Sequence, residues 1–136
     1  MRRHAGRALL AAAGLLNTAP AIGAVAPQGM YAAYGIAAAD RDLEVVLRHR
    51  AVLFAVVGIG LLLAILRPAL RPIAVCANAI SFGGFLVLVI VGGPVGPGLM
   101  RVAAFDVVGL VALGVGVACL RDERAVAQGR SIAGRR

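Results

Sequence analysis

The stretch AVLFAVVGIGLLLAIL, residues 51–66, decides the fold, because it contains sixteen consecutive apolar or small residues and no charge. Arg50 directly precedes it and Arg67 directly follows it. A helix needs about 20 apolar residues to cross the ~30 Å hydrocarbon core of a bilayer. Residues 45–47, Val-Val-Leu, can extend the stretch outward. The pattern therefore predicts a transmembrane helix over about residues 45–66.

Three other stretches have the same character, at residues 8–26, 73–93 and 102–120. The chain of 136 residues is 61% hydrophobic, and its mean hydropathy of +0.93 is well above that of soluble domains. Strand-like alternation is absent, and helices satisfy their own backbone polar groups in lipid. Short connections rich in proline and glycine force neighbouring helices to run antiparallel. The expected fold class is an all-α, integral membrane, four-helix up-down bundle.

All 14 basic residues are arginine, and their distribution predicts the orientation in the membrane, since cytoplasmic loops retain basic residues. With both termini inside, ten arginines lie near cytoplasmic helix ends and four near external ends. The external four are Arg41, Arg48, Arg50 and Arg101. We therefore expect a multi-pass protein of the cell membrane with a cytoplasmic N-terminus and C-terminus. Residues 1–120 form its transmembrane domain, and residues 121–136 form a flexible basic tail drawn to anionic lipid head groups.

The first apolar stretch also has features of a secretory signal. Arginines precede it, and Ala24-Val25-Ala26 imitates an A-x-A cleavage site. Pro27, directly after that site, argues against cleavage. We favour a retained helix that is kinked at Pro20, and the cleaved alternative would leave three helices with the same orientation.

Residues 27–50 form a connection long enough to have structure of its own. Asp40 is suited to cap a helix, because its side chain can accept a hydrogen bond from a backbone N–H of the first turn. Asp42 and Glu44 then lie in that turn, where carboxylates are favourable. We predict a helix that begins here and continues into the second span without a break.

Small residues spaced four apart allow transmembrane helices to approach closely, which replaces the hydrophobic drive that lipid does not supply. Three such pairs are candidates for helix contacts: Ala51 with Ala55, Ala79 with Gly83, and Ala112 with Gly116. With 18 glycines in the chain, such pairs also arise by chance. They therefore do not decide which helices meet.

Asp106 is the strongest candidate for chemistry, because it is an acidic residue inside an apolar span. It follows Arg101 by five residues, which places it about 7.5 Å below the external surface at ~1.5 Å per residue. Arg50 lies about 6 Å below the same surface by the same measure. Opposite charges at one depth in lipid tend to pair. We therefore expect Asp106 to meet Arg50, with His49 or Arg48 nearby.

Two interpretations of this cluster are open. In the first, which we favour, Arg50 and Asp106 form an ion pair that fixes the register of the second and fourth helices. In the second, Asp106 and His49 form a proton or ligand site that opens outward, since intramembrane ionisable groups are commonly functional and histidine titrates near neutral pH. A third, lesser alternative is that Asp106 simply extends to the membrane interface.

The other buried polar candidates are Asn17 with Thr18 on the first span, and Asn78 and Ser81 on the third. Asn17 and Ser81 both lie about 13 Å from the cytoplasmic edge by helical rise, so a hydrogen bond between them is feasible. The favoured expectation is that these side chains satisfy nearby backbone groups, particularly around Pro20, which leaves a carbonyl of its helix without a donor.

Several classes of function are excluded by the residues present. The chain has no lysine, so it lacks the lysine of a Walker phosphate site and of a Schiff base. Its two histidines are far in sequence from its two cysteines, so we expect no metal site and no cofactor. Cys76 and Cys119 lack C-x-x-C spacing, which argues against a disulfide-forming enzyme. The arginines are divided among membrane edges, so no nucleic-acid partner is expected.

Four short motifs are distinctive against the apolar background. They are LRHRAVLF at residues 47–54, YGI at 34–36, RPAL at 67–70, and Asp106. In these motifs the chain resembles a group of small, uncharacterised bacterial four-helix membrane proteins of the broad DoxX-like type, over about residues 14–120. The resemblance implies a bacterial inner-membrane protein with no established reaction.

Some proteins of this appearance are named phosphopantetheine adenylyltransferase. The soluble enzyme of that name has a nucleotide-binding α/β fold and an H-x-G-H type phosphate motif. Here His49 is followed by Arg50, Ala51 and Val52, and no segment supplies a strand, glycine loop and helix of that kind. This activity is therefore the least favoured alternative.

The expected function is that of a structural or accessory membrane component without catalysis. The alternative is a small transporter, or a lipid- or quinone-binding protein, that uses the external cluster of Arg50, His49 and Asp106. Expected partners are membrane lipids and either a second copy of the chain or another membrane protein, because a bundle this small encloses little room for a substrate.

Overall fold

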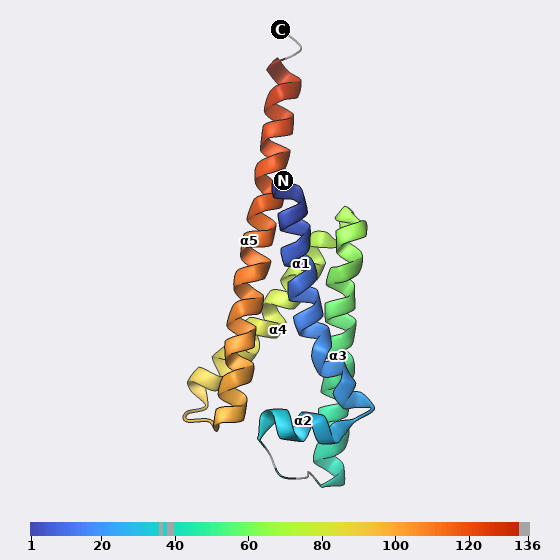
Figure 1. Cartoon of the computed structure of the whole chain (residues 1–136), viewed down its shortest axis with the longest axis vertical. Helices are drawn as coiled ribbons and strands as arrows, with labels where there is room; N and C mark the ends of the chain where they lie inside the picture. The colour runs from blue at the N-terminus through green and yellow to red at the C-terminus, as the bar shows by residue number, and fades with distance from the viewer. Residues whose placement is uncertain (36, 38–39, 134–136) are drawn as a thin grey trace.

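The structure, a computed structural model, describes residues 1–35, 37 and 40–133, with side chains as far as Arg121. This part of the chain is helical almost throughout and contains no strand, so the all-α prediction is confirmed (Figure 1). Its elements are α1 (Arg2–Thr18), the 3-10 helix η1 (Ala19–Ala24), α2 (Pro27–Tyr34), α3 (Arg41–Leu66), the 3-10 helix η2 (Pro68–Leu70), α4 (Arg71–Val91) and α5 (Pro97–Ala133).

Three helices in the described part of the chain are long and apolar enough to cross a membrane. They are α3, α4 together with η2, and the Pro97–Arg121 portion of α5. The N-terminal segment Arg2–Ala24 adds a fourth candidate when it is taken together with α2, from which it is bent by 120°. Length and composition therefore support a multi-pass membrane protein with three or four spans.

The start of α3 follows the predicted capping pattern. The backbone N–H of Leu43 donates to Asp40 Oδ1 at 2.8 Å, and Asp42 and Glu44 lie in the first turn. The side-chain acceptor and the two carboxylates start the helix at Arg41, well before the apolar stretch. The helix then continues to Leu66 without a break, as expected.

Replacing Asp40 with alanine should lower the free energy of unfolding by about 1 kcal/mol, because the cap loses its side-chain acceptor. The measurement is the loss of helical circular dichroism as the protein, in mild detergent, is titrated with sodium dodecyl sulfate. Asp40→Asn keeps an acceptor oxygen and should retain most of the stability. An equal loss in the two variants would contradict a capping role.

The helices α1, α3, α4 and α5 pack side by side and alternate in direction along the chain (Figure 1). α1 packs chiefly against α5 and α3, and α4 packs against the same two helices. All four contribute to one buried apolar core, made of Leu10, Ala13, Leu61, Ala64, Ala74, Phe82, Ala112, Leu113 and Leu120. The connections at η2 and before α5 are short, so α3, α4 and α5 pack in chain order. The packing of α1 against α5 joins the first and last long helices.

Glycines let α1 approach both of its neighbours at backbone distance. A Cβ atom at Gly58 of α3 would lie 2.6 Å from the Gly14 carbonyl oxygen of α1. A Cβ atom at Gly116 of α5 would lie 3.1 Å from a backbone oxygen of α1, and Ala112, one turn earlier, is buried. The candidate pair of Ala112 and Gly116 therefore lies at a helix contact. At Gly83 a Cβ atom would meet nothing within 4 Å, so that candidate pair does not mark a close approach.

The connection after the first span contains the helix α2, which lies across the end of the other helices (Figure 1). It ends at Gly35, whose φ of 67° is in the left-handed region that favours glycine. Gly98, at the start of α5, lies against this turn, and a Cβ atom there would be 2.8 Å from the Gly35 nitrogen. This contact holds the end of α2, with Tyr34, against the first turn of α5.

Three element boundaries differ from the predicted ones. α1 begins at Arg2 rather than at residue 8, and η1 takes the place of the expected kink at Pro20. α5 continues past Leu120, so the segment predicted as a flexible tail is helical as far as Ala133. The residues after Arg121 are rich in alanine, arginine, glutamate and glutamine, which are good helix formers outside lipid. Residues 134–136 of the predicted tail lie outside the described part of the chain.

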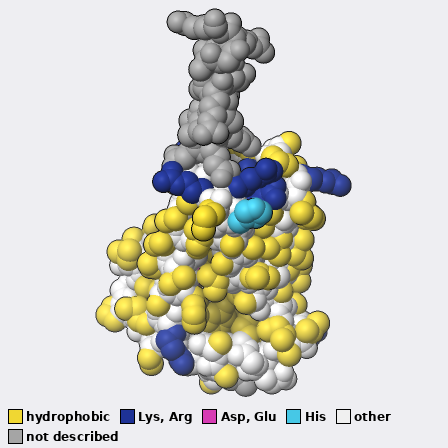
Figure 2. All heavy atoms as spheres, turned by 45° about the horizontal axis from the view of Figure 1, so that its top comes forward, with side chains coloured by type: hydrophobic (Ala, Val, Ile, Leu, Met, Phe, Trp, Pro, Cys, Tyr) yellow, Lys and Arg dark blue, Asp and Glu magenta, His cyan; other side chains and the backbone are white. Residues whose placement is uncertain are grey.

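The surface has two distinct zones (Figure 2). Apolar side chains cover much of the flank that Figure 2 shows. Ile59, Ile80 and Val111, on three different helices, are exposed. Arginine side chains gather in a band at the end from which α5 projects. An apolar flank with a basic band at one end is the distribution that a lipid-embedded helical protein requires.

Candidate functional site

The candidate site consists of two adjoining spaces near α2. A small polar pocket of about 30 Å³ has walls from all four long helices. An apolar groove of about 520 Å³ lies between the end of α1, η1, α2 and the start of α5. Both spaces are lined by Leu16, Pro20, Tyr34, Val102 and Asp106. The pocket therefore forms the inner end of the groove.

A hydrogen-bond network of three polar side chains adjoins the pocket. Asn78 is fully buried, with 0% of its surface exposed, and its Oδ1 accepts from Asn17 Nδ2 at 2.9 Å. Its own Nδ2 donates to the carbonyl of Val57 at 3.1 Å and to that of Ala74 at 2.8 Å. Ser81 Oγ donates to Asn17 Oδ1 at 3.1 Å. The network therefore ties α1, α3 and α4 together inside the apolar core.

The feasible contact between Asn17 and Ser81 is confirmed by this network. The favoured expectation, that these side chains satisfy nearby backbone groups, is correct for Thr18, whose Oγ1 donates to the Gly14 carbonyl at 2.8 Å. It is also correct for one bond of Asn78, to the carbonyl four residues earlier on α4. It is wrong for Asn17 and Ser81, because α1 and α4 present their polar groups to each other at the same depth. Asn17 and Ser81 can therefore bond to each other across the helices, and neither has to bond to a carbonyl of its own helix, which would bend it.

The Arg50 guanidinium lies over three aromatic rings. Its Cζ is 4.9 Å from the centroid of Phe54, 5.4 Å from that of Tyr34 and 5.4 Å from that of Phe85. The rings come from α3, α2 and α4, so three separate elements converge on this cation. A cation–π contact contributes about 0.5–2 kcal/mol, with the larger values where water is excluded. The rings therefore compensate for part of the hydration that Arg50 loses inside the protein.

Asp106 is half-buried on α5 and lies between the pocket and the groove. Arg50, across the pocket, is the cation that acts on it electrostatically. The two side chains are both described, and no ion pair of 4.0 Å or less joins them. The expected direct contact is therefore not formed, because the guanidinium faces the aromatic rings instead. The pocket is large enough for a water molecule, which can link the two charges.

The groove outside Asp106 is mainly apolar. Its wall includes Ile22 of η1, Met30 of α2 and Phe105 of α5. Ile22 and Phe105 are 68% and 60% exposed, so the groove opens onto the apolar flank of the molecule. Arg101 is a second charged residue on its wall. The space thus has a long apolar part and a charged inner end.

The other residues of the predicted cluster lie elsewhere. Arg48 pairs with Glu44, one turn earlier on α3, with Nε 3.2 Å from the carboxylate. His49 is exposed, and neither residue lines the pocket or the groove. Successive residues of a helix are rotated by about 100°. When Arg50 turns inward, His49 and Arg48 therefore turn away from Asp106.

Sequence reasoning missed Tyr34 and Phe85 as partners of Arg50, and it missed the groove itself. The amino-acid sequence did contain a signal for Phe85. Asn78, Ser81 and Phe85 are spaced three and four residues apart, which places them on one face of a helix. No comparable signal existed for Tyr34, whose position depends on how α2 folds back over the helix ends.

Comparison with known proteins adds no further constraint. No protein-family model matches the chain, and the searches of curated proteins and of solved structures return no similar protein.

Proposed function

We propose that this chain is a four-span membrane protein, with both termini in the cytoplasm, that binds one amphiphilic molecule of the lipid or quinone class in the groove between η1, α2 and α5. The observation that carries the proposal is the position of Asp106. This residue lies where the apolar groove meets the polar pocket. A ligand with an apolar tail and a polar head would match both spaces at once.

The size and lining of the groove support a ligand of this class. Pockets that bind small molecules have volumes of about 300–1,000 Å³, with mostly apolar walls and a few convergent polar groups. The groove, at about 520 Å³, falls within this range. A hydroxyl head group could donate a hydrogen bond to the Asp106 carboxylate. A carbonyl head group could accept one from the Arg50 guanidinium across the pocket. The tail would leave the groove past Ile22 and Phe105, toward lipid.

The distribution of arginine supports the proposed orientation. Arg2, Arg7, Arg67 and Arg121 belong to the helix ends opposite α2, and the arginine band of Figure 2 lies at that end. The end with α2 carries fewer arginines and the acidic first turn of α3. By the positive-inside rule the site then lies near the external leaflet.

Native mass spectrometry of the protein released from a gentle detergent tests the proposal. The expected spectrum contains a protein peak with one additional molecule, whose mass identifies it as a lipid or quinone. Gly29→Phe should remove this molecule, because Gly29 lines the groove and a Cβ atom there would meet no atom within 4 Å, which leaves room for the ring. Gly84→Phe is the matched control, since Gly84 is equally unobstructed but lies outside the groove.

Asp106→Asn separates binding from folding in the same experiment. If Asp106 contacts the head group, the variant should fold with normal helical circular dichroism and lose at least about tenfold in occupancy, which corresponds to ~1.4 kcal/mol. Loss of folding would instead show that Asp106 has a structural role. A bound molecule that survives both Gly29→Phe and Asp106→Asn would refute the proposed site.

A structural or accessory role is the second candidate, and the exposure of α4 favours it. Of the three single-helix spans, α4 with η2 buries the smallest share of its residues. Val87, Leu88, Ile90 and Val91 are all exposed on it. A repeated stoichiometry in the same native spectra, without a bound small molecule, would favour this role. The motif at residues 47–54 leads us to propose kinship with DoxX-like membrane proteins as well.

A further inference from the structure

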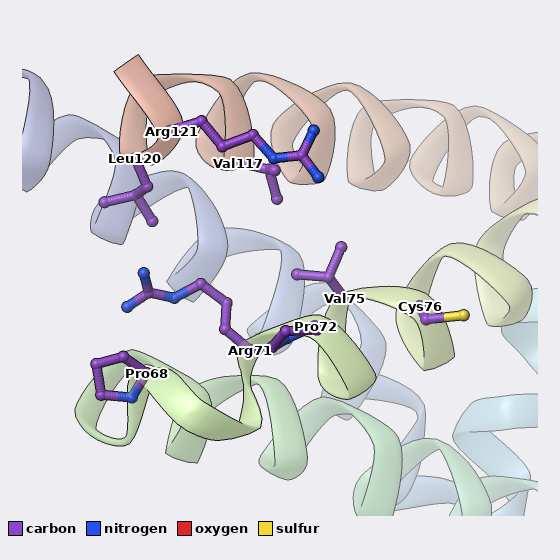
Figure 3. A pocket seen from close by; sticks show the side chains of 8 residues that line it. All are labelled: Pro68, Arg71, Pro72, Val75, Cys76, Val117, Leu120 and Arg121. Atoms are coloured by element: carbon purple, nitrogen blue, oxygen red, sulfur yellow. The ribbon is translucent and has the colours of Figure 1, made fainter. Parts of the chain in front are cut away.

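We propose that a second pocket, at the end of the molecule opposite the groove, binds the head group of an anionic phospholipid. This pocket has a volume of about 350 Å³. It lies between η2 and the first turns of α4 on one side and α5 on the other (Figure 3). It shares no lining residue with the groove. The inference therefore depends on membrane insertion but not on the ligand proposed for the groove.

Two arginines, on opposite walls, contribute positive charge to this pocket. Arg71 belongs to the first turn of α4, and Arg121 belongs to α5. Figure 3 shows that their guanidinium groups extend in opposite directions along the opening. A guanidinium carries a permanent positive charge and can bind two oxygens of one phosphate group. The opening thus offers phosphate-binding groups at two points.

The remaining walls are suited to the apolar part of a lipid. Val75 of α4 faces Val117 of α5 across the pocket, with Leu120 beside them (Figure 3). A free inorganic anion would gain nothing from these side chains, whereas the first part of an acyl chain would bury apolar surface against them. The combination of guanidinium groups and apolar walls therefore favours a phospholipid over a soluble anion.

The position of the pocket along the helices agrees with the depth of lipid head groups. Arg121 directly follows the apolar stretch of α5 at residues 102–120, and Pro68 begins the apolar segment that continues through α4. Phosphates of a bilayer lie at this boundary between hydrocarbon and water. The band of arginines at the same end (Figure 2) would also concentrate anionic lipids there.

Lipid titrations followed by native mass spectrometry test this inference. The full chain in detergent is titrated with phosphatidylglycerol or with phosphatidylcholine of the same acyl chains. The unmodified chain should prefer phosphatidylglycerol by about tenfold, since each basic residue near a lipid surface favours anionic lipid. Arg71→Gln with Arg121→Gln should reduce this preference to within about twofold. Arg41→Gln with Arg48→Gln removes the same charge at the other end, from residues that line none of the three spaces, and should leave the preference intact.

Two further arms keep the result decisive. Arg121 is exposed, so Arg121→Gln alone tests the pocket if the double variant fails to fold, and it should lower the preference about threefold. Inorganic phosphate in excess should not displace the bound lipid, and displacement would show that the pocket recognises a free anion instead. Equal binding of the two lipids by the unmodified chain, or a preference that is undiminished in Arg121→Gln, would overturn the inference. Gly29→Phe, which fills the groove, should not affect the preference.

Discussion

Gly58→Ala is expected to lower the free energy of unfolding by about 3 kcal/mol, at the upper end of what overpacking of a core usually costs. The added Cβ atom would lie 2.6 Å from the Gly14 carbonyl oxygen and 2.8 Å from the Thr18 nitrogen. Both are backbone atoms of α1, so no rotation of a side chain can relieve the contact. The helices α1 and α3 would have to move apart.

Gly60→Ala is the matched control for this experiment. Gly60 lies on the same helix, two residues further on, and a Cβ atom there would meet no atom within 4 Å. Its replacement should change the free energy of unfolding by less than about 1 kcal/mol, the difference in helix propensity between the two residues. Both values are measured by circular dichroism during unfolding with sodium dodecyl sulfate. Similar values for the two variants would contradict the close approach of α1 to α3.

Asn78→Ala is expected to lower the free energy of unfolding by about 2–3 kcal/mol, since it leaves a small cavity and an unsatisfied buried donor on Asn17. Asn78 is fully buried, and its amide contacts α1 and α3 as well as its own helix. Polar contacts between membrane helices contribute about 0.6–2 kcal/mol each. Because Asn78→Ala removes several hydrogen bonds at once, its cost in unfolding free energy should exceed that of losing any one of them.

A double-mutant cycle measures how much of this loss in unfolding free energy comes from the hydrogen bond between Asn17 of α1 and Asn78 of α4. Asn17→Ala and Asn78→Ala, made separately and together, should show a coupling energy of about 1 kcal/mol. Ile80→Val is the control on α4, because Ile80 is 68% exposed and its change should stay within about 0.5 kcal/mol. A coupling energy near zero would mean that the hydrogen bond at 2.9 Å does not stabilise the fold.

These two variants bear on the proposed site as well as on stability. The Asn17 and Ser81 side chains line the pocket that Asp106 and Arg50 share, and Asn78 holds Asn17 in place. If α1 moved away from α3 or α4, the inner end of the groove would widen. Ligand binding should therefore be measured in Gly58→Ala only at temperatures where its helical signal equals that of the unmodified chain.

The apolar stretches were sufficient to predict a helical membrane protein. A run such as residues 73–93 is long and apolar enough to cross a membrane as a helix, whatever surrounds it. The cap at Asp40 was equally predictable, because a capping hydrogen bond depends only on residues three apart in the chain. Such features are local, so the amino-acid sequence carries them in full.

The candidate site was only partly predictable. Helical rise correctly placed Asp106 and Arg50 at one level, and the structure puts both on the wall of one pocket. The rise along a helix does not give the direction in which a side chain points, and Arg50 faces Tyr34, Phe54 and Phe85 rather than the carboxylate. The three aromatic rings already stabilise the Arg50 guanidinium in its position. This explains why the expected ion pair with Asp106 is absent between these two described residues.

The all-α class, the apolar segments, the capped start of α3 and the polar residues inside the spans could all be predicted from the amino-acid sequence. Each of them depends on composition or on neighbours within one helical turn. Only the tertiary structure decided that α2 turns back by 120° relative to the first segment and forms one wall of a groove. It also decided that Asn78 joins three helices and that His49 lies away from Asp106. These features depend on the rotation of each helix about its axis and on backbone contacts such as that between Gly35 and Gly98. Such contacts join residues far apart in the chain, and no local pattern records them.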